Sequence, residues 1–211
     1  MPTKPTRPPR RGTYHHGNLR AALIEATLRL VEEAGPEKVS VREVAKRAGV
    51  SSGAPFRHFP TRTALLTAVA EDAMTRLCAE IAATMEREAG LDPLQRFRAL
   101  GTAYLRWVTR NPTHFQIISN RKVIDFDGSQ TLRRDNDGLK DLMDGLLHEA
   151  QRDGLLRSGD LTRIPLAGRA LAYGLARMYV DGHFPQWDVK PRGAVKAMQE
   201  AFDVFVAGLG A

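Results

Sequence analysis

Residues 40–66, SVREVAKRAGVSSGAPFRHFPTRTALL, decide the fold of the N-terminal part of the chain. Ser40 and Glu43 form an S-x-x-E capping box that opens a short helix, and Gly49 ends that helix. Ser51 is positioned to cap a second short helix directly afterwards. Two short helices joined by a glycine turn are typical of a helix-turn-helix, whose second helix fits the major groove of DNA. The alternative is an ordinary pair of short helices inside a helical core.

The second helix of this pair is predicted to meet base edges with its N-terminal residues, because these enter the groove first. The side chains there are small, which allows close approach of the backbone, and the serines can bond to bases or phosphates. Arginines on the first helix and after the second are placed to contact phosphates, as are those of the N-terminal arm. The DNA-contacting residues predicted in this way are Arg10, Arg11, Arg42, Ser51, Ser52, Ala54, Pro55 and Arg62.

The positive charge of the chain lies almost entirely in its first 60 residues. They hold 11 Lys and Arg against 5 Asp and Glu, whereas the rest of the 211 residues hold 20 against 19. This polarity predicts an N-terminal module that binds a polyanion, attached to a nearly neutral body. Residues 1–16 contain four prolines and little apolar content, so they are expected to form a flexible basic arm. On the arm alone, a tail that only aids solubility is an equal alternative.

The remainder of the chain reads as helical, because apolar residues recur at helical spacing and no convincing period-two strand is present. Asp92 and Asn111 are each followed by proline, an arrangement typical of helix starts, and residues 120–134 are expected to form a loop. The sequence therefore predicts an all-α protein of about nine helices, with a helix-turn-helix domain over residues 17–62 and a helical body over residues 63–211. The last three helices are expected over residues 135–153, 164–183 and 192–208.

Residues 42–66 resemble, almost position for position, the signature segment of the TetR family of bacterial transcriptional regulators. The resemblance is specific over about residues 14–75. It implies a three-helix DNA-binding head, a six-helix ligand-binding body and a homodimer, and it adds Phe56 and His58 to the DNA-contacting residues. The family usually has tyrosine at the position of Phe56, so the phosphate contact of that hydroxyl is not expected here.

The body is loosely similar to a subgroup of this family whose C-terminal domain is called WHG. The similarity rests on YHHGNLR at residues 14–20 and RWVTRNPTHFQII at residues 106–118. Homodimerisation is expected through the last two helices, with Gly174 marking a close approach between backbones. A small hydrophobic or aromatic effector is expected to bind between the central helices, against apolar and aromatic side chains with a few polar tips. The predicted effector-binding residues are Phe97, Tyr104, Trp107, Phe115, Met143, Leu147 and Tyr179.

Other classes of protein are disfavoured by what the sequence lacks. It contains no nucleophile or acid–base constellation, no metal-ligand spacing and no cofactor motif, so neither an enzyme nor a cofactor is expected. No apolar run is long enough to span a membrane and the start does not resemble a secretory signal, so a cytoplasmic location is expected. The favoured hypothesis is a repressor released from a palindromic operator by its effector. The alternative is a nucleoid-type DNA-binding protein without an effector, which predicts no pocket.

Overall fold

The computed structural model describes residues 19–157 and 162–211, and these residues form helices without any β-strand. The predicted all-α fold is confirmed. The described α-helices are α1 (Leu19–Ala34), α2 (Val41–Arg47), α3 (Arg62–Arg87), α4 (Pro93–Arg110), α5 (Pro112–Ile118), α6 (Gln130–Arg152), α7 (Ile164–Val180) and α8 (Ala194–Ala207).

The second helix of the predicted helix-turn-helix is present as a single 3-10 turn, η2 (Ala54–Arg57), and not as an α-helix reaching residue 58. This is why the described residues contain eight α-helices where about nine were predicted. Gly53, in place of the expected Ser51, occupies the N-cap position of η2, and no side chain caps this turn. Pro55 has no N–H to donate and Pro60 follows closely, so the segment has room for one turn only. Three further 3-10 turns lie among the described residues: η1 (Pro36–Lys38), η3 (Phe184–Trp187) and η4 (Pro191–Gly193).

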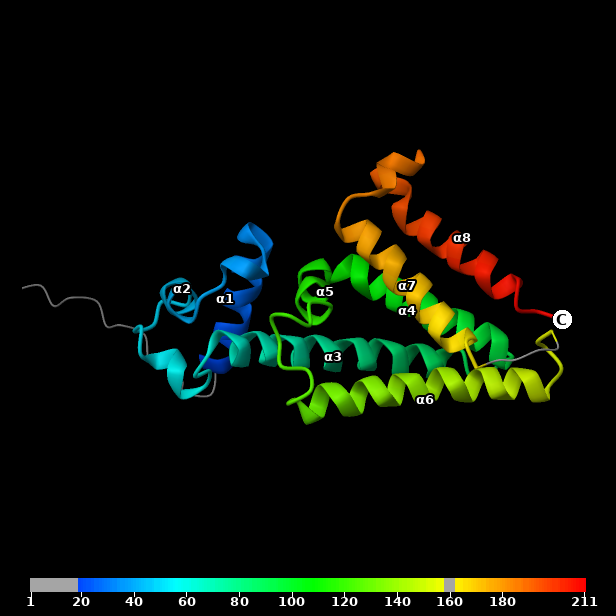
Figure 1. The fold of residues 1–211 in the computed structure, drawn as a ribbon, viewed down its shortest axis with the longest axis horizontal. Coiled ribbons are helices and arrows are strands. Elements are labelled where there is room, and N and C mark those ends of the chain that lie inside the picture. Colours follow the sequence, from blue (N-terminus) through cyan, green and yellow to red (C-terminus); the bar gives the residue numbers. More distant parts are fainter. Residues whose placement is uncertain (1–18, 158–161) are drawn as a thin grey trace, which may run out of the picture.

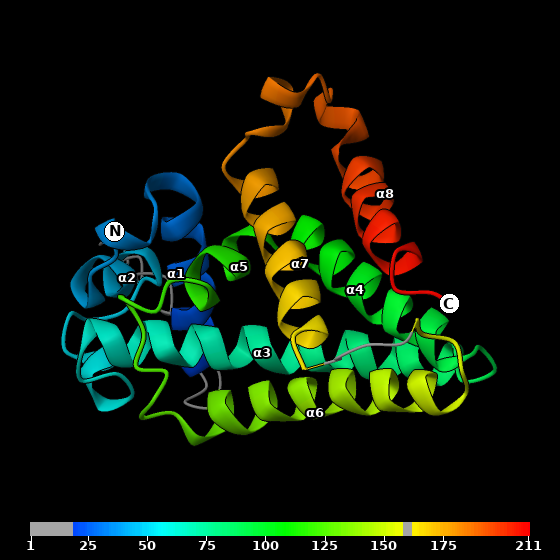
Figure 2. The same cartoon turned by 45° about the vertical axis from the view of Figure 1, so that its right-hand side comes forward.

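The chain forms a small head at one end and a larger helical body at the other (Figure 1). α1, α2 and η2 make up the head, and the long helix α3 runs from it through the body. α6 lies alongside α3 in both ribbon views, while α4 packs against α3, α6, α7 and α8 (Figure 2). α4 is therefore the central helix of the body, and α7 and α8 form its outer layer.

Local capping explains where the main helices begin. The Ser40, Thr61 and Asp92 side chains accept hydrogen bonds from the backbone N–H groups three residues later, at 3.2, 3.0 and 2.8 Å. Ser129 does the same at the start of α6, accepting from the Leu132 N–H at 3.2 Å. The loop expected over 120–134 therefore ends at 129, because this cap starts α6 five residues earlier than predicted.

The boundary predicted between residues 62 and 63 falls in the first turn of α3. This helix serves both parts of the molecule, since Leu65 and Leu66 are completely buried near α1 whereas Leu77 and Ile81 are buried in the body. Hydrophobic burial thus joins the head and the body through one continuous helix. No helix within the described residues combines the length and apolar character needed to cross a membrane.

One close contact sets the distance between α4 and α8. Gly101 faces the ring of Phe202, and a Cβ at this glycine would lie 2.9 Å from Cδ1 of that ring and closer still to Cε1 and Cζ. Phe202 is buried and its ring centroid lies 6.2 Å from that of Phe97. The two helices can pack at this distance only because residue 101 has no side chain.

Candidate functional site

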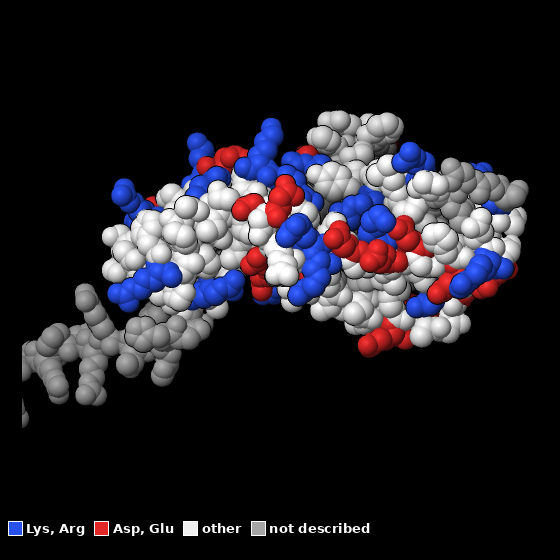
Figure 3. Space-filling view, turned by 60° about the horizontal axis from the view of Figure 1, so that its bottom comes forward, with Lys and Arg blue, Asp and Glu red and all other residues white. Residues whose placement is uncertain are grey.

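The outer surface of the head carries most of the residues predicted to contact DNA. Ser51, Ser52, Phe56 and His58 are exposed around η2, and Phe56 is 44% exposed despite being aromatic. Arg42 on α2 is also exposed and makes no ion pair with a described residue. Figure 3 shows Lys and Arg side chains around an uncharged centre at this end of the molecule. The surface is thus basic at its rim and small or polar at its centre, as contact with a nucleic acid requires.

Two of the predicted DNA-contacting residues serve the head itself. Arg62 donates hydrogen bonds from Nε to the Val39 carbonyl at 2.9 Å and from Nη2 to the Pro36 carbonyl at 2.6 Å. It therefore ties the loop after α1 to the first turn of α3, which leaves fewer of its donors for a phosphate. Pro55 is buried, so its side chain packs inside the head instead of facing outwards. Ala54 is half-buried beside it.

Arg10 and Arg11 lie outside the described residues, as does the whole arm predicted over residues 1–16. Arg57, which was not among the selected DNA-contacting residues, is exposed at the end of η2. Like Arg42, it makes no hydrogen bond or ion pair with a described residue. The position of Arg57, one turn after Ala54, could have identified it as a DNA-contacting residue. Residues three positions apart lie on the same face of a 3-10 turn.

A cavity of about 310 Å³ lies in the body between α3, α4, α5, α6 and α7. This volume is at the lower end of the range for small-molecule sites. The structure brings five of the seven predicted effector-binding residues together around it. They are Phe97, Tyr104, Trp107, Phe115 and Met143.

The other two predicted residues do not line this cavity. Leu147 is buried but lies at an open groove between α6 and α7 that adjoins the cavity. Tyr179 lies seven residues after Ala172, which lines the cavity, and this places it roughly 10 Å further along α7. The apolar pattern marked both as facing inwards, but it gives no information about where along a helix a cavity ends.

Polar and aromatic groups missed by the sequence analysis complete the wall of the cavity. Arg169 and Tyr173 are four residues apart on α7 and so share a face, a spacing that could have identified them. Arg121 comes from the irregular segment after α5, where no periodicity guides a prediction. The polar and aromatic residues missed are Ser119, Arg121, Phe126, Asn136, Arg169, Tyr173 and Phe202.

The hydroxyl groups of Ser119 and Tyr104 at the cavity have no hydrogen-bond partner among the described residues. Ser119 Oγ is buried and unpaired. Tyr104 donates to no described residue, and burial raises the pKa of its phenol, so this hydroxyl stays protonated. An unpaired polar group in an apolar wall is unfavourable, and a ligand that accepts a hydrogen bond would relieve this cost.

The cavity adjoins the head through α5. Phe115 and Ile118 on this helix line the cavity, and α5 also contacts α1 of the head. Immediately after α5, Asn120 donates a hydrogen bond from Nδ2 to Glu37 Oε1 at 3.2 Å, and Glu37 lies 3.7 Å from Arg62. A change at the cavity wall therefore has a short physical route to the loop that Arg62 holds in the head.

Comparisons with known proteins match both parts of the chain. The family model described as "Bacterial regulatory proteins, tetR family" matches residues 23–69. The model described as "Tetracyclin repressor-like, C-terminal domain" matches residues 97–202, half of the chain. The chain belongs to the TetR family. The match to the first model ends at residue 69, inside α3, and the loose similarity to the WHG subgroup stays a prediction.

Two relatives of similar sequence have names that describe different roles, one a transcriptional repressor and the other a nucleoid occlusion factor. The HTH-type transcriptional repressor KstR of Rhodococcus jostii is 31% identical over 134 residues, 64% of this chain and 60% of the relative. The nucleoid occlusion factor SlmA of Vibrio vulnificus is 27% identical over 143 residues, 67% of this chain and 71% of the relative. The match to KstR therefore spans less than two thirds of that relative's length.

Solved structures support the TetR fold over nearly the whole chain. A protein of unknown function from Rhodococcus sp. RHA1 is 31% identical, with a TM-score of 0.76 over 95% of this chain and 100% of that one. The regulator PfmR of Thermus thermophilus is 20% identical, with a TM-score of 0.71 over 90% of this chain and 99% of that one. At this identity the PfmR match shows the fold alone.

Proposed function

We propose that this TetR-family protein is a DNA-binding transcriptional repressor whose dimer is released from a palindromic operator by a small hydrophobic effector. The observation that carries the proposal is the apolar cavity in the body, which adjoins α5, the helix that also contacts the head. The proposed setting is the cytoplasm, where the operator is accessible. No catalytic step or cofactor forms part of the proposal.

DNA contact is assigned to the exposed surface around η2. Ser51 and Ser52 reach base edges, while Arg42 and Arg57 contact phosphates on either side of them. The basic arm, with Arg10 and Arg11, adds charge that is independent of sequence. In a dimer, two such heads read half-sites about one helical turn apart, ~34–36 Å.

Dimerisation is assigned to the outer face of α7 and α8. This face carries exposed apolar side chains, of which Leu166 is 62% and Val204 74% exposed. Gly174 on α7 has nothing within 4 Å of the position of a Cβ, which leaves open space for a neighbouring backbone. Two helices from each subunit would form a four-helix interface with twofold symmetry.

The effector acts by binding more tightly to the conformation that does not fit the operator. A ligand with equal affinity for both conformations would shift nothing. A coupling of about 1–3 kcal/mol weakens DNA binding roughly 5- to 150-fold. The similarity to SlmA favours the alternative of a nucleoid-binding protein, but such a protein does not require the cavity.

The experiment measures release of DNA as a function of cavity volume. Binding of the dimer to its upstream intergenic DNA is followed by fluorescence anisotropy while apolar and aromatic small molecules are screened for release. Ala172→Leu fills the cavity from α7 without removing packing, so it is expected to abolish release and to preserve DNA binding. Ala79→Leu, on the exposed face of α3, is the matched control.

Release that is equally strong in Ala172→Leu and in the control would place the effector elsewhere. Binding that does not distinguish the intergenic DNA from random DNA, with no release by any compound, would favour the nucleoid-type alternative. Arg42→Ala is expected to weaken binding to both kinds of DNA and to lower the salt slope by about one unit.

A further inference from the structure

The charges in the wall of the effector cavity have one sign. Arg121 and Arg169 line the cavity, whereas no Asp or Glu is found among the described residues that line it. Neither guanidinium lies within ion-pair distance of a carboxylate in residues 19–157 or 162–211. Both side chains are exposed to solvent, so an otherwise apolar wall carries two positive charges at its edge that no described carboxylate pairs.

Arg121 lies at the solvent-exposed edge of the cavity. Its guanidinium carbon lies 3.1 Å from the ring centroid of Phe126, so it stacks on an aromatic side chain instead of pairing with an acid. Burial lowers the pKa of this guanidinium, the charge of Asp127 acts in the opposite direction, and the charge of Arg169 lowers the pKa again. Both arginines line the same cavity.

Arg169 stands at the opening of the cavity. It donates a hydrogen bond from Nη2 to Asn136 Oδ1 at 3.0 Å, which joins α7 to α6. Its charge opposes the burial that raises the pKa of Tyr104, so the unpaired phenol hydroxyl lies within its electrostatic reach. Two guanidinium groups and a hydroxyl donor therefore belong to the wall of one cavity.

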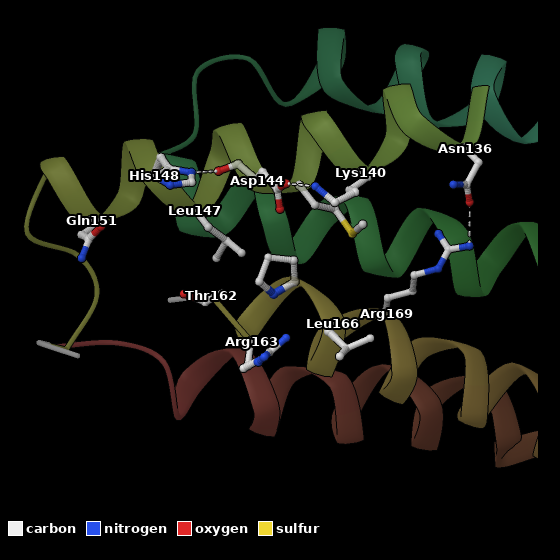
Figure 4. A pocket seen from close by; sticks show the side chains of 12 residues that line it. Asn136, Lys140, Asp144, Leu147, His148, Gln151, Thr162, Arg163, Leu166 and Arg169 are labelled. Carbon is white, nitrogen blue, oxygen red and sulfur yellow. Dashed lines mark hydrogen bonds and ion pairs between the residues drawn. The ribbon is translucent and has the colours of Figure 1, made fainter. Parts of the chain in front are cut away.

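The same opening leads into an open groove of about 760 Å³ between α6 and α7. Asn136, Met143 and Arg169 line both the groove and the cavity, so the two hollows meet at these side chains. Figure 4 shows Arg169 and Asn136 at one end of the groove, with Lys140 and Arg163 further along it. Asp144, the carboxylate among the groove residues, already pairs with Lys140 at 2.6 Å. Beyond Arg169, the groove therefore adds one further cation, Arg163, that no described carboxylate pairs.

We propose that the effector is an amphipathic anion, with its apolar part in the cavity and its carboxylate or phosphate group at Arg169 and Arg121, where the cavity opens into the groove. This inference rests on the proposed function, because it names the chemical class of the effector. A planar guanidinium binds either anion through two parallel hydrogen bonds. Such a group would lie against both positive charges and accept a hydrogen bond from Tyr104, while the aromatic wall takes up the apolar part.

The test compares three ten-carbon probes that differ in their head groups: decanoate, decyl phosphate and the neutral decanol. Binding to the full-length protein is measured by titration calorimetry at pH 7.5. Arg169→Gln and Arg121→Gln remove one positive charge each. Arg177→Gln is the matched control, since Arg177 lies on the same helix, pairs with Asp181 at 2.7 Å and lines neither hollow.

At least one anionic probe is expected to bind about ten- to a hundredfold more tightly than decanol, as a charge-assisted hydrogen bond implies. Arg169→Gln and Arg121→Gln are expected to remove most of this preference, with decanol affinity and the Arg177→Gln variant unchanged. A preference for decyl phosphate over decanoate would place the larger head group in the groove, and the reverse order would place the anion at the opening alone.

The two proposals fail in distinguishable ways. If decanol binds as tightly as both anions, or if the arginine variants keep the preference, the anionic effector is refuted while the cavity remains an effector site. If none of the three probes binds, the anionic effector is refuted together with the cavity as a site for apolar ligands.

Discussion

Gly101→Ala is expected to destabilise the body, although alanine is the better helix former. The new Cβ would overlap the ring of Phe202, which is buried between α4 and α8 and cannot move without displacing Phe97 or Phe205. Relief of this overlap requires α8 to move away from α4 or the Phe202 ring to leave its rotamer. Either change disturbs the layer on which the proposed dimer interface is built.

The magnitude follows from two opposing effects. Overpacking of a well-packed core costs about 1–3 kcal/mol, whereas replacing glycine within a helix gains about 0.5–1 kcal/mol. Gly145→Ala on α6 is the matched control, because this glycine is also helical but has nothing within 4 Å of a Cβ. We therefore expect Gly101→Ala to be less stable than the control by about 1–3 kcal/mol, with ~2–4 °C in Tm for each kcal/mol.

Thermal and urea unfolding at one fixed protein concentration measure this difference, because the stability of a dimer depends on concentration. A second substitution, Phe202→Leu, removes the ring that the new Cβ would meet. The cost of Gly101→Ala is expected to be smaller in this background, which a double-mutant cycle detects as a coupling of about 0.5–3 kcal/mol. Equal stability of Gly101→Ala and Gly145→Ala, or no coupling to Phe202, would refute the close contact between α4 and α8.

Three further predictions concern pH, coupling and assembly. Burial and then the charge of Arg76 lower the pKa of His114 in the folded state, so the stability of the fold is expected to fall as the pH drops below ~6.5. His114→Gln should reduce this loss of stability, measured by unfolding curves at pH 8 and pH 5.5. An unchanged pH dependence in the variant would contradict the prediction. Asn120→Ala removes the hydrogen bond to Glu37 and is expected to weaken effector-induced release of DNA about two- to tenfold without changing effector affinity. Unaltered release would exclude this hydrogen bond as the connection between the cavity and the head. Val204→Glu places a charge on the exposed face of α8 and is expected to give monomers in light scattering, whereas a dimer of unchanged affinity would rule out that interface.

The fold was predictable from the sequence because its signals are local. Helical spacing of apolar residues and start signals such as Ser40 and Asp92 located most helix starts within a few residues. The exceptions have local causes as well: Ser129 was not recognised as a cap, and a proline after Gly53 turned the expected recognition helix into a single 3-10 turn. The periodicity of apolar residues cannot predict the conformation of a segment as short as Ala54–Arg57.

The candidate sites were predictable only in part, because they depend on contacts between distant parts of the chain. Aromatic residues of the cavity such as Trp107 were found through their helical face, but Arg121 and Arg169 were missed because charged residues are expected on the surface. Arg62 was assigned to DNA because of its position and its charge. Its bonds to the carbonyls of Pro36 and Val39 depend on a fold that brings residues 23 to 26 positions apart together.

The continuity of α3 makes it a lever. Its 26 residues extend for about 39 Å, from the Arg62 contacts in the head to the far end of the body. A tilt of roughly 5° about the far end would displace the head by about 3 Å, close to the ~3.4 Å that separates successive base pairs of DNA. A rearrangement in the body too small to disturb its packing would therefore carry the head one step out of register with the groove. Because α3 is continuous, a fragment cut at residue 62 would lose Leu65 and Leu66 from the core of the head. The head therefore needs the first turns of α3 in order to fold.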